Sequence, residues 1–513
     1  MRKALEILIA LGILLVMASG LFAEKMRLNV VEHDLENGMK ILILERHTSP
    51  VVSFYLRFKV GSVDEHPGIT GIAHLCEHMM FKGTKNVGTW NYGAEAPLLD
   101  RIDSLAHQWR REVECTRHPL YRGDTPRLEE LRQEIAEIQQ EEKDYIIKDE
   151  LWETYMKNGG IRLNASTGND GTQYFVSLPA NTIELWAYLE SDRIANPIFR
   201  EFYSERDVVN EERRLRTDDQ PWGKLWEEFY AAAFTAHPYS WPVIGWATDI
   251  QMILREDVER FFRTYYAPNN TIAVIVGDVN PAEVIDLCEK YFGPIPAQEP
   301  PPPVITEEPP QAGERRVTVQ FDAEPIVAIG YHVPGGGDPD QPVLEVIASL
   351  LSRGKTSRFY KNIVEKKIAT SVNAYAPFSR YPELFTVTAT PLKPHSTQEV
   401  EEAIYVELEK LKTEPVSEWE LEKFANQLEA DFIRGMKSNM GMAWRLGNYQ
   451  ALVGDWRHLL VHKRELGAVT PQDIMRVAKR YLNDSNRTVA TLVKKESKKN
   501  TTRVKPESSR PYY

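Results

Sequence analysis

The stretch that decides the fold is residues 71–84, Gly-Ile-Ala-His-Leu-Cys-Glu-His-Met-Met-Phe-Lys-Gly-Thr. Its apolar residues and the Lys-Gly pair that follows them predict a helix over about 72–81. His74 and His78 are four residues apart, so they lie one above the other on this helix and can bind one metal ion. Glu77 lies beside them and can act as a general base. Two unrelated histidines on a buried helix are the alternative, but buried imidazoles need polar partners.

The third ligand of such a site has to come from another segment, because catalytic zinc usually has three protein ligands. A helix predicted around residues 201–216 carries Glu205, Glu211 and Glu212. Glu205 and Glu212 are seven residues apart and share a face, whereas Glu211 is rotated away from it. We therefore expect Glu212 to bind the metal and Glu205 to orient one histidine. Without the histidine pair, the same segment would be interpreted as a solvated charged helix.

The segments around these helices show strand and helix patterns that predict an α+β first half. Asn37-Gly38 lies between two apolar runs and predicts a β-hairpin. Two long charged helices are expected over 98–114 and 127–156. Because most of the strands join through turns or hairpins, the sheet should be mainly antiparallel. Further strands are predicted at 51–60, 161–165, 173–178 and 271–276, and further helices at 182–194 and from residue 281.

A proline-rich segment, residues 297–313, divides the chain into residues 24–296 and residues 314–495. The second part repeats a strand and a helix of the first, and this self-similarity predicts two copies of one domain. When Gly354 is set against Gly83, the second copy lacks the metal-binding pattern. The positions of the two histidines and the glutamate are taken there by Glu345, Ala348 and Ser349.

Composition excludes some functions and indicates where the protein acts. With 62 Lys+Arg against 74 Asp+Glu the net charge is −12, which argues against a nucleic-acid-binding protein. Residues 1–23 have the basic start, apolar run and small residues of a secretory signal, which we expect to be cleaved; a retained membrane anchor is the alternative. Three cysteines cannot form a disulfide framework. We therefore expect a periplasmic or secreted protein with a flexible tail at 496–513.

Residues 71–84 closely resemble the zinc peptidases of the pitrilysin and mitochondrial-processing-peptidase group, family M16. Residues 205–214 resemble that family's distal-glutamate helix, and Leu163-Asn164-Ala165 resembles its substrate-side strand. The resemblance implies two α/β-sandwich halves of the LuxS/metallopeptidase type that form a clamshell. It also implies one zinc ion per chain. By this resemblance, the zinc ligands are His74, His78 and Glu212, and the general base is Glu77. Glu205 would support the site, and the substrate would contact Asn164 and Ala165.

Two departures from the family pattern matter. His78 and Glu212 are 134 residues apart (212 − 78), which we interpret as a helical insertion over about 92–158. Active members also have an Arg and a Tyr in the second half that hold the substrate carbonyl, but this chain has Val364 and Thr370 there. One solution is a homo- or heterodimer in which an M16-like subunit supplies that pair.

The function implied by this resemblance is zinc-dependent endopeptidase action on peptides or unfolded polypeptides in the bacterial cell envelope. A non-catalytic scaffold on the same fold is one alternative, and a zinc-bearing subunit that is inactive without a zinc-free partner is another. A zinc carrier would usually have a histidine-rich loop, whereas the 12 histidines of this chain are scattered.

Overall fold

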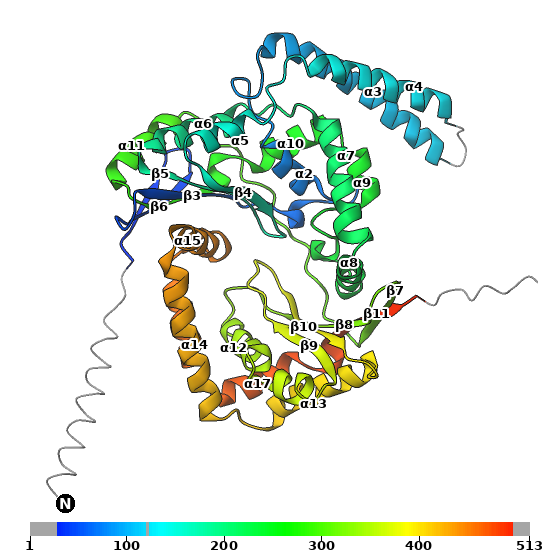
Figure 1. Cartoon of the computed structure of the whole chain (residues 1–513), viewed down its shortest axis with the longest axis vertical. Coiled ribbons are helices and arrows are strands. Elements are labelled where there is room, and N and C mark those ends of the chain that lie inside the picture. The colour runs from blue at the N-terminus through cyan, green and yellow to red at the C-terminus, as the bar shows by residue number, and fades with distance from the viewer. Residues whose placement is uncertain (1–27, 119–122, 496–513) are drawn as a thin grey trace, which may run out of the picture.

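The computed structural model describes residues 28–118 and 123–495. The predicted secretory signal, residues 1–23, and the predicted tail, residues 496–513, lie outside this range. The described chain is an α+β protein in which two sheets lie one above the other, each covered by helices (Figure 1). None of the helices in the described residues is long and apolar enough to span a membrane.

The first half contains a six-stranded sheet with the order β1-β2-β6-β3-β5-β4. The predicted hairpin is confirmed, because β1 and β2 pair antiparallel with Asp34 opposite Lys40. β2 and β6 run parallel, and the other neighbours are antiparallel. The strands are β1 Val30–Asp34, β2 Lys40–Glu45, β3 Val51–Phe58, β4 Ile161–Thr167, β5 Thr172–Pro179 and β6 Thr271–Gly277.

The second sheet repeats the topology of the first. Its order, β7-β11-β8-β10-β9, corresponds strand by strand to β2-β6-β3-β5-β4, including the one parallel pair, β7 with β11. Since both sheets have the same order and directions, the chain consists of two copies of one fold. The strands are β7 Arg315–Phe321, β8 Ile326–Val333, β9 Ala369–Tyr375, β10 Glu383–Pro391 and β11 Arg487–Lys494.

Helices cover the outer faces of both sheets. The motif helix is α2 Ile72–Met79, and its counterpart in the second copy is α12 Gln341–Ser352. In the first half the other helices are α6 Ile183–Ala195, α7 Phe202–Arg213, α9 Ala247–Met252, α10 Arg255–Tyr265 and α11 Pro281–Tyr291. In the second half they are α13 Thr397–Thr413, α14 Glu418–Lys437, α16 His458–Ala468 and α17 Pro471–Tyr481.

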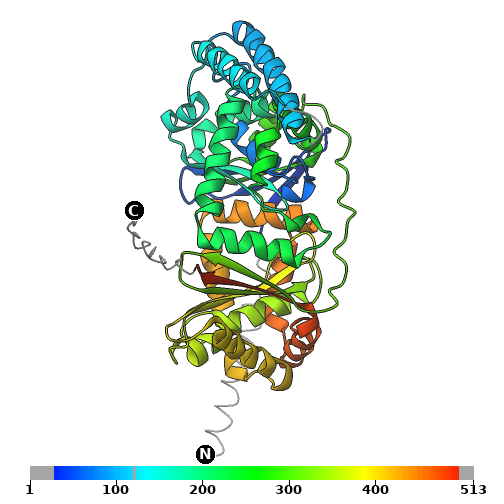
Figure 2. The ribbon, with the colours of Figure 1, turned by 90° about the vertical axis from the view of Figure 1, so that its right-hand side faces the viewer.

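The segment between α2 and β4 projects from the first half as a helical hairpin, α3 Tyr92–Arg117 and α4 Thr125–Glu142 (Figures 1 and 2). The prediction of one helix over 127–156 is wrong, because the helical pattern is interrupted between α4 and α5 Glu150–Lys157. The backbone of residues 145–147 instead forms hydrogen bonds with residues 88–90, Trp90 N–H to Tyr145 O and Ile147 N–H to Gly88 O. These bonds are incompatible with a continuous helix.

Two helices are exchanged between the halves, which the sequence did not predict. α15 Asn439–Val453, from the second half, packs on β3 and β6 of the first sheet, and α8 Pro221–Ala233, from the first half, packs on β7 and β11 of the second. Both helices lie between the two sheets, α15 in orange and α8 in green (Figures 1 and 2). Each exchanged helix completes a buried apolar cluster of the other half, Leu446 with Tyr55 and Val274, and Phe229 with Ala328 and Leu492. The halves are therefore interlocked.

Candidate metal centre

A glycine and a buried glutamate fix the start of α2. Gly71 has φ +90°, and a Cβ there would lie 2.4 Å from the Ile244 carbonyl oxygen, so only glycine fits. The buried Glu65 accepts hydrogen bonds of 2.9 Å from the N–H groups of Gly71 and Ala73, which would otherwise be unpaired at the helix start. This cap fixes the first turn of α2 immediately before His74.

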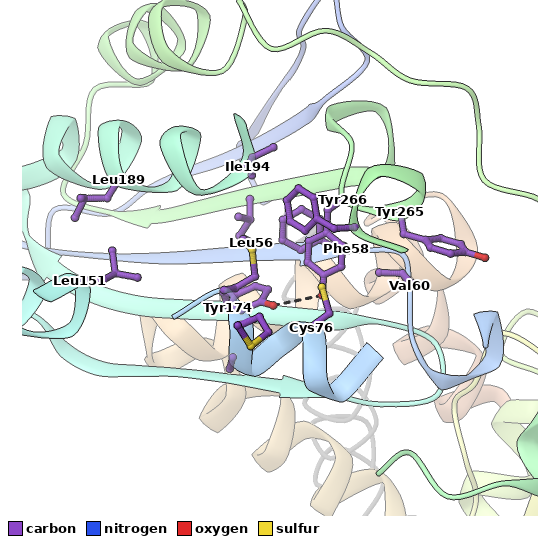
Figure 3. Close-up of a cluster of buried hydrophobic side chains, with 14 of the residues drawn as sticks. Leu56, Phe58, Val60, Cys76, Leu151, Tyr174, Leu189, Ile194, Tyr265 and Tyr266 are labelled. Carbon is purple, nitrogen blue, oxygen red and sulfur yellow. Dashed lines mark hydrogen bonds between the residues drawn. The ribbon is translucent and has the colours of Figure 1, made fainter. Parts of the chain in front are cut away.

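The inner face of α2 is anchored in the core of the first half. Cys76 is fully buried and lies in a cluster with Phe58, Tyr174 and Tyr266 (Figure 3). Because one face of the helix is committed to the core, residues one turn apart on another face, His74 and His78, are directed together toward α7.

The structure brings His74, His78 and Glu212 together, although 134 residues separate the last two. His74 Nε2 lies 3.8 Å from Glu212 Oε1, and His78 Nε2 lies 3.4 Å from Glu212 Oε2. Two atoms that bind one tetrahedral zinc at its usual bond lengths lie roughly 3.4 Å apart. The three donors, two imidazoles and a carboxylate, therefore fit a zinc ion, and ligation by them stays a prediction.

Glu205 holds His78 in the orientation that a metal ligand needs. Its Oε1 lies 2.9 Å from His78 Nδ1, and its Oε2 lies 2.7 Å from Lys82 Nζ. Burial opposes the charge of Glu205, but the bonds from His78 and Lys82 outweigh it and lower the pKa of this carboxyl to about 2. A carboxylate bonded to Nδ1 leaves Nε2 of His78 free to bind a metal.

The two histidines differ in protonation. Burial and the neighbouring His78 lower the pKa of His74 to about 4, so His74 is neutral. Burial also opposes the charge of His78, but its bonds to Glu205 and Glu212 raise the pKa of His78 to about 9. The bond to His78 in turn lowers the pKa of Glu212. Because a metal ligand must be unprotonated, a metal ion that binds here displaces the proton of His78.

Glu77 is placed beside this cluster by a residue that the sequence analysis missed. Thr167, the last residue of β4, donates a hydrogen bond of 2.5 Å from its hydroxyl to Glu77 Oε2. Burial raises the pKa of Glu77, and the Thr167 bond partly counteracts this effect. The strand prediction ended at Ala165, two residues too early to include Thr167.

The sequence analysis also missed a role for Arg216. Its Nη1 lies 2.5 Å from Glu212 Oε1, so this arginine forms an ion pair with the third predicted ligand.

Asn164 and Ala165 lie on β4, which is the last strand in the order of the first sheet. They pair with Phe175 and Tyr174 of β5 on one side, and no described strand pairs with β4 on the other. Asn164 is exposed, and the next residue, Ala165, points to the opposite face of the sheet and is buried. A free strand edge on the strand that packs against α2 is suited to pairing with an extended peptide, and the role of these residues in substrate binding stays a prediction.

In the second half, the side chains of Val364 and Thr370 make contacts within that half. Val364 packs against the apolar core of that half. The Thr370 hydroxyl donates to the carbonyl oxygen of Thr390 at 3.1 Å, within its own sheet. Glu345, Ala348 and Ser349 lie on α12, so the helix that corresponds to α2 has no histidine pair.

Comparison with known proteins identifies the family of the chain. The family described as "Insulinase (Peptidase family M16)" matches residues 40–95, and "Peptidase M16 inactive domain" matches residues 253–428. Zinc protease PqqE of Helicobacter pylori is 30% identical over 467 residues, which are 89% of this chain and 91% of that protein. The chain belongs to peptidase family M16.

The chain is also similar to other bacterial proteases. An uncharacterized zinc protease of Mycobacterium tuberculosis, Rv2782c, is 26% identical over 435 residues, 83% of this chain and 84% of its own. A crystal structure of a Helicobacter pylori protease superimposes with a TM-score of 0.76 at 27% identity and covers 91% of this chain and 100% of its own. The first half of the periplasmic protease PqqL of Escherichia coli shares the fold, with a TM-score of 0.66 at 18% identity over 90% of this chain and 92% of its own.

Proposed function

We propose that this M16 chain is a zinc-dependent endopeptidase that hydrolyses peptides or unfolded polypeptides in the bacterial cell envelope. The observation that carries the proposal is the position of Glu77. Its carboxylate lies on the same helix as two metal-binding histidines and is held by Thr167 rather than by a cation. A scaffold or a zinc carrier has no use for a buried carboxylate held beside its metal ligands.

The chemistry follows from the residues present. Zinc held by His74, His78 and Glu212 would polarise the scissile carbonyl and acidify the attacking water. Glu77 accepts the proton of this water and passes it to the leaving amine, for which a carboxyl of raised pKa is suited. Glu205 keeps His78 in place throughout. A peptide added to the free edge of β4 at Asn164 and Ala165 would bind through main-chain hydrogen bonds, with loose demands on its sequence.

The cellular location rests on residues 1–23, which have the pattern of a secretory signal. PqqL, a protein of the same fold, is a periplasmic protease. Cleavage of the signal would release the chain into the periplasm or the medium, and retention would leave it anchored to the membrane.

Hydrolysis of an unstructured fluorogenic peptide tests the proposal. The purified chain should cleave it, a chelator should abolish cleavage, and added zinc should restore it. Glu77→Gln should bind zinc as the wild type does and lose nearly all activity. Glu211→Gln is the matched control, because Glu211 is exposed and, within residues 28–118 and 123–495, bonds only Arg214. Chelator-resistant cleavage, or full activity of Glu77→Gln, would contradict the proposal.

A second possibility is favoured by Val364 and Thr370, which direct no donor to the substrate carbonyl. Loss of one donor of this kind typically costs about 100-fold or more in kcat. We therefore propose that a second, different M16-like subunit supplies the missing Arg and Tyr in a heterodimer, because a second copy of this chain would have the same Val364 and Thr370. Zinc binding without cleavage by the isolated chain, with cleavage restored by an M16 relative that has the pair, supports this arrangement. Full activity of the isolated monomer would refute it.

A further inference from the structure

A second group of metal-binding side chains lies on α16, in the half without the motif. His458, His462 and Glu465 are spaced at i, i+4 and i+7, so they project from one face of the helix. One ligand atom from each of them lies within 4.8 Å of the others, the same limit that the His74, His78 and Glu212 group satisfies. Three potential ligands thus converge where neither the family nor the proposed mechanism requires a metal.

His462 is held as a metal ligand would be. Its ring is buried, and its Nε2 lies 3.0 Å from Glu345 Oε1. With Nε2 protonated and bonded to a carboxylate, the lone pair of Nδ1 is free, and Nδ1 lies 4.0 Å from Glu465 Oε2. A histidine that donates to a carboxylate with one nitrogen and faces further ligands with the other is the usual arrangement around protein-bound zinc. It repeats the relationship of His78 to Glu205.

The neighbours of the cluster keep these groups in place. Glu345 lies on α12 at the position that corresponds to His74 on α2, and its Oε1 also accepts a 2.9 Å hydrogen bond from Gln341 Nε2. The rings of Phe378 and Tyr449 lie 5.4 Å and 6.0 Å from the ring of His462. The imidazole and the carboxylate that orients it are therefore fixed before any metal binds.

The other two members are accessible. His458 is half-buried, and within the described chain its ring nitrogens have no hydrogen-bond partner. Glu465 is exposed. A metal ion can therefore reach the site from solvent, and a small change of rotamer at Glu465 can shorten its distance to the imidazoles.

We propose that His458, His462 and Glu465 form a second metal-binding site, which takes zinc or another late first-row divalent metal, with Glu345 as a positioning residue. Two imidazoles and one carboxylate suit zinc, nickel or copper, whereas calcium and magnesium prefer oxygen ligands throughout. The inference is independent of the proposed peptidase activity, because it concerns other residues on other helices.

Zinc binding to the full chain tests the site after the first one is removed by His74→Ala with Glu212→Gln. This double variant should still bind one equivalent of zinc in equilibrium dialysis. Adding His458→Ala should abolish binding at the same free zinc, and adding Glu345→Gln should weaken it by about 10- to 100-fold. His395→Ala is the matched control. His395 also lies near a glutamate four residues on, Glu399, at 3.6 Å, but the described residues offer it no third ligand.

Several results would overturn the proposal. The double variant binding no zinc would do so, as would binding that survives His458→Ala or that is equally strong for magnesium. Glu465→Gln is a second test at an exposed position, where a folding defect is not expected. Cobalt substituted for zinc should give visible absorption bands typical of low coordination in the double variant, and the bands should disappear with His458→Ala.

Discussion

Thr167 donates its hydroxyl hydrogen to Glu77 Oε2 across 2.5 Å, and this bond connects the edge strand β4 with the helix that carries the candidate general base. The same strand offers its free edge at Asn164 and Ala165. A peptide that pairs with this edge would therefore lie on the strand that also holds Glu77.

Thr167→Val should lower kcat by roughly 10- to 100-fold, because hydrogen bonds to charged groups contribute about 1.5–3 kcal/mol. Zinc content should stay unchanged, since Thr167 does not contact the predicted ligands. Steady-state kinetics together with metal analysis measure both quantities. Ser166→Ala is the control on the same strand, because the Ser166 hydroxyl accepts from Gln173 and is exposed. An equal loss of kcat in both variants would show that the loss comes from a general disturbance of β4 and not from the hydrogen bond to Glu77.

Glu205→Gln should weaken zinc binding by about 10- to 100-fold, because His78 loses the carboxylate that orients it. Competition with a chromophoric chelator measures the affinity. Glu211→Gln, on the same helix but exposed, should bind zinc like the wild type. Unchanged affinity in Glu205→Gln would remove Glu205 from the site.

Leu446→Ala should lower the free energy of unfolding by about 2–5 kcal/mol, because Leu446 on α15 is fully buried against the sheet of the other half. Urea unfolding measures the effect. Trp444→Ala, on the same helix but 51% exposed, should cost far less. If α15 did not pack on the first sheet, the two substitutions would lower the free energy of unfolding by similar amounts.

Because α8 and α15 each pack on the sheet of the other half, we also expect that neither half folds well alone. A fragment that ends within the proline-rich segment leaves Leu42, Tyr55 and Val274 without the helix that covers them. Such a fragment should bind a hydrophobic dye and aggregate, and co-expression with the second half should rescue it. A monomeric, dye-free fragment would contradict this expectation.

Glu383 should make stability depend on pH near the junction of the halves. Burial raises the pKa of its carboxyl to about 8, and the hydrogen bond from the Leu384 N–H only partly counteracts this effect. The other groups that face the carboxyl are Tyr230, Asn169 and Asp170. The folded chain keeps this proton while the unfolded chain loses it near pH 4.5, so stability should fall by up to a few kcal/mol as pH rises from about 4.5 to 8.

Glu383→Gln, which resembles the protonated form, should flatten this part of the profile. Urea unfolding at a series of pH values compares the two proteins. Parallel curves would mean that Glu383 does not carry the dependence.

Much of the fold could be predicted from local patterns. The hairpin at Asn37-Gly38, the strands of the first sheet and the repeat after the proline-rich segment all follow from turn residues and apolar periodicity. The prediction of one helix over 127–156 was wrong, because the helical sequence pattern continues across residues 143–149. In the structure these residues are not helical, since main-chain hydrogen bonds to residues 88–90 fix another conformation. Local periodicity contains no information about such partners.

By itself the sequence determined that His74, Glu77 and His78 share one side of a helix, because their spacing of three and four residues matches the helical repeat. Spacing on α7 likewise separated Glu212 and Glu205 from Glu211. Only the tertiary structure placed Thr167 against Glu77, exchanged α8 and α15 between the halves, and brought Glu345 to His462. The reason is physical: a helical pattern shows which face is apolar or polar, but the partner of that face depends on contacts between residues far apart in the chain.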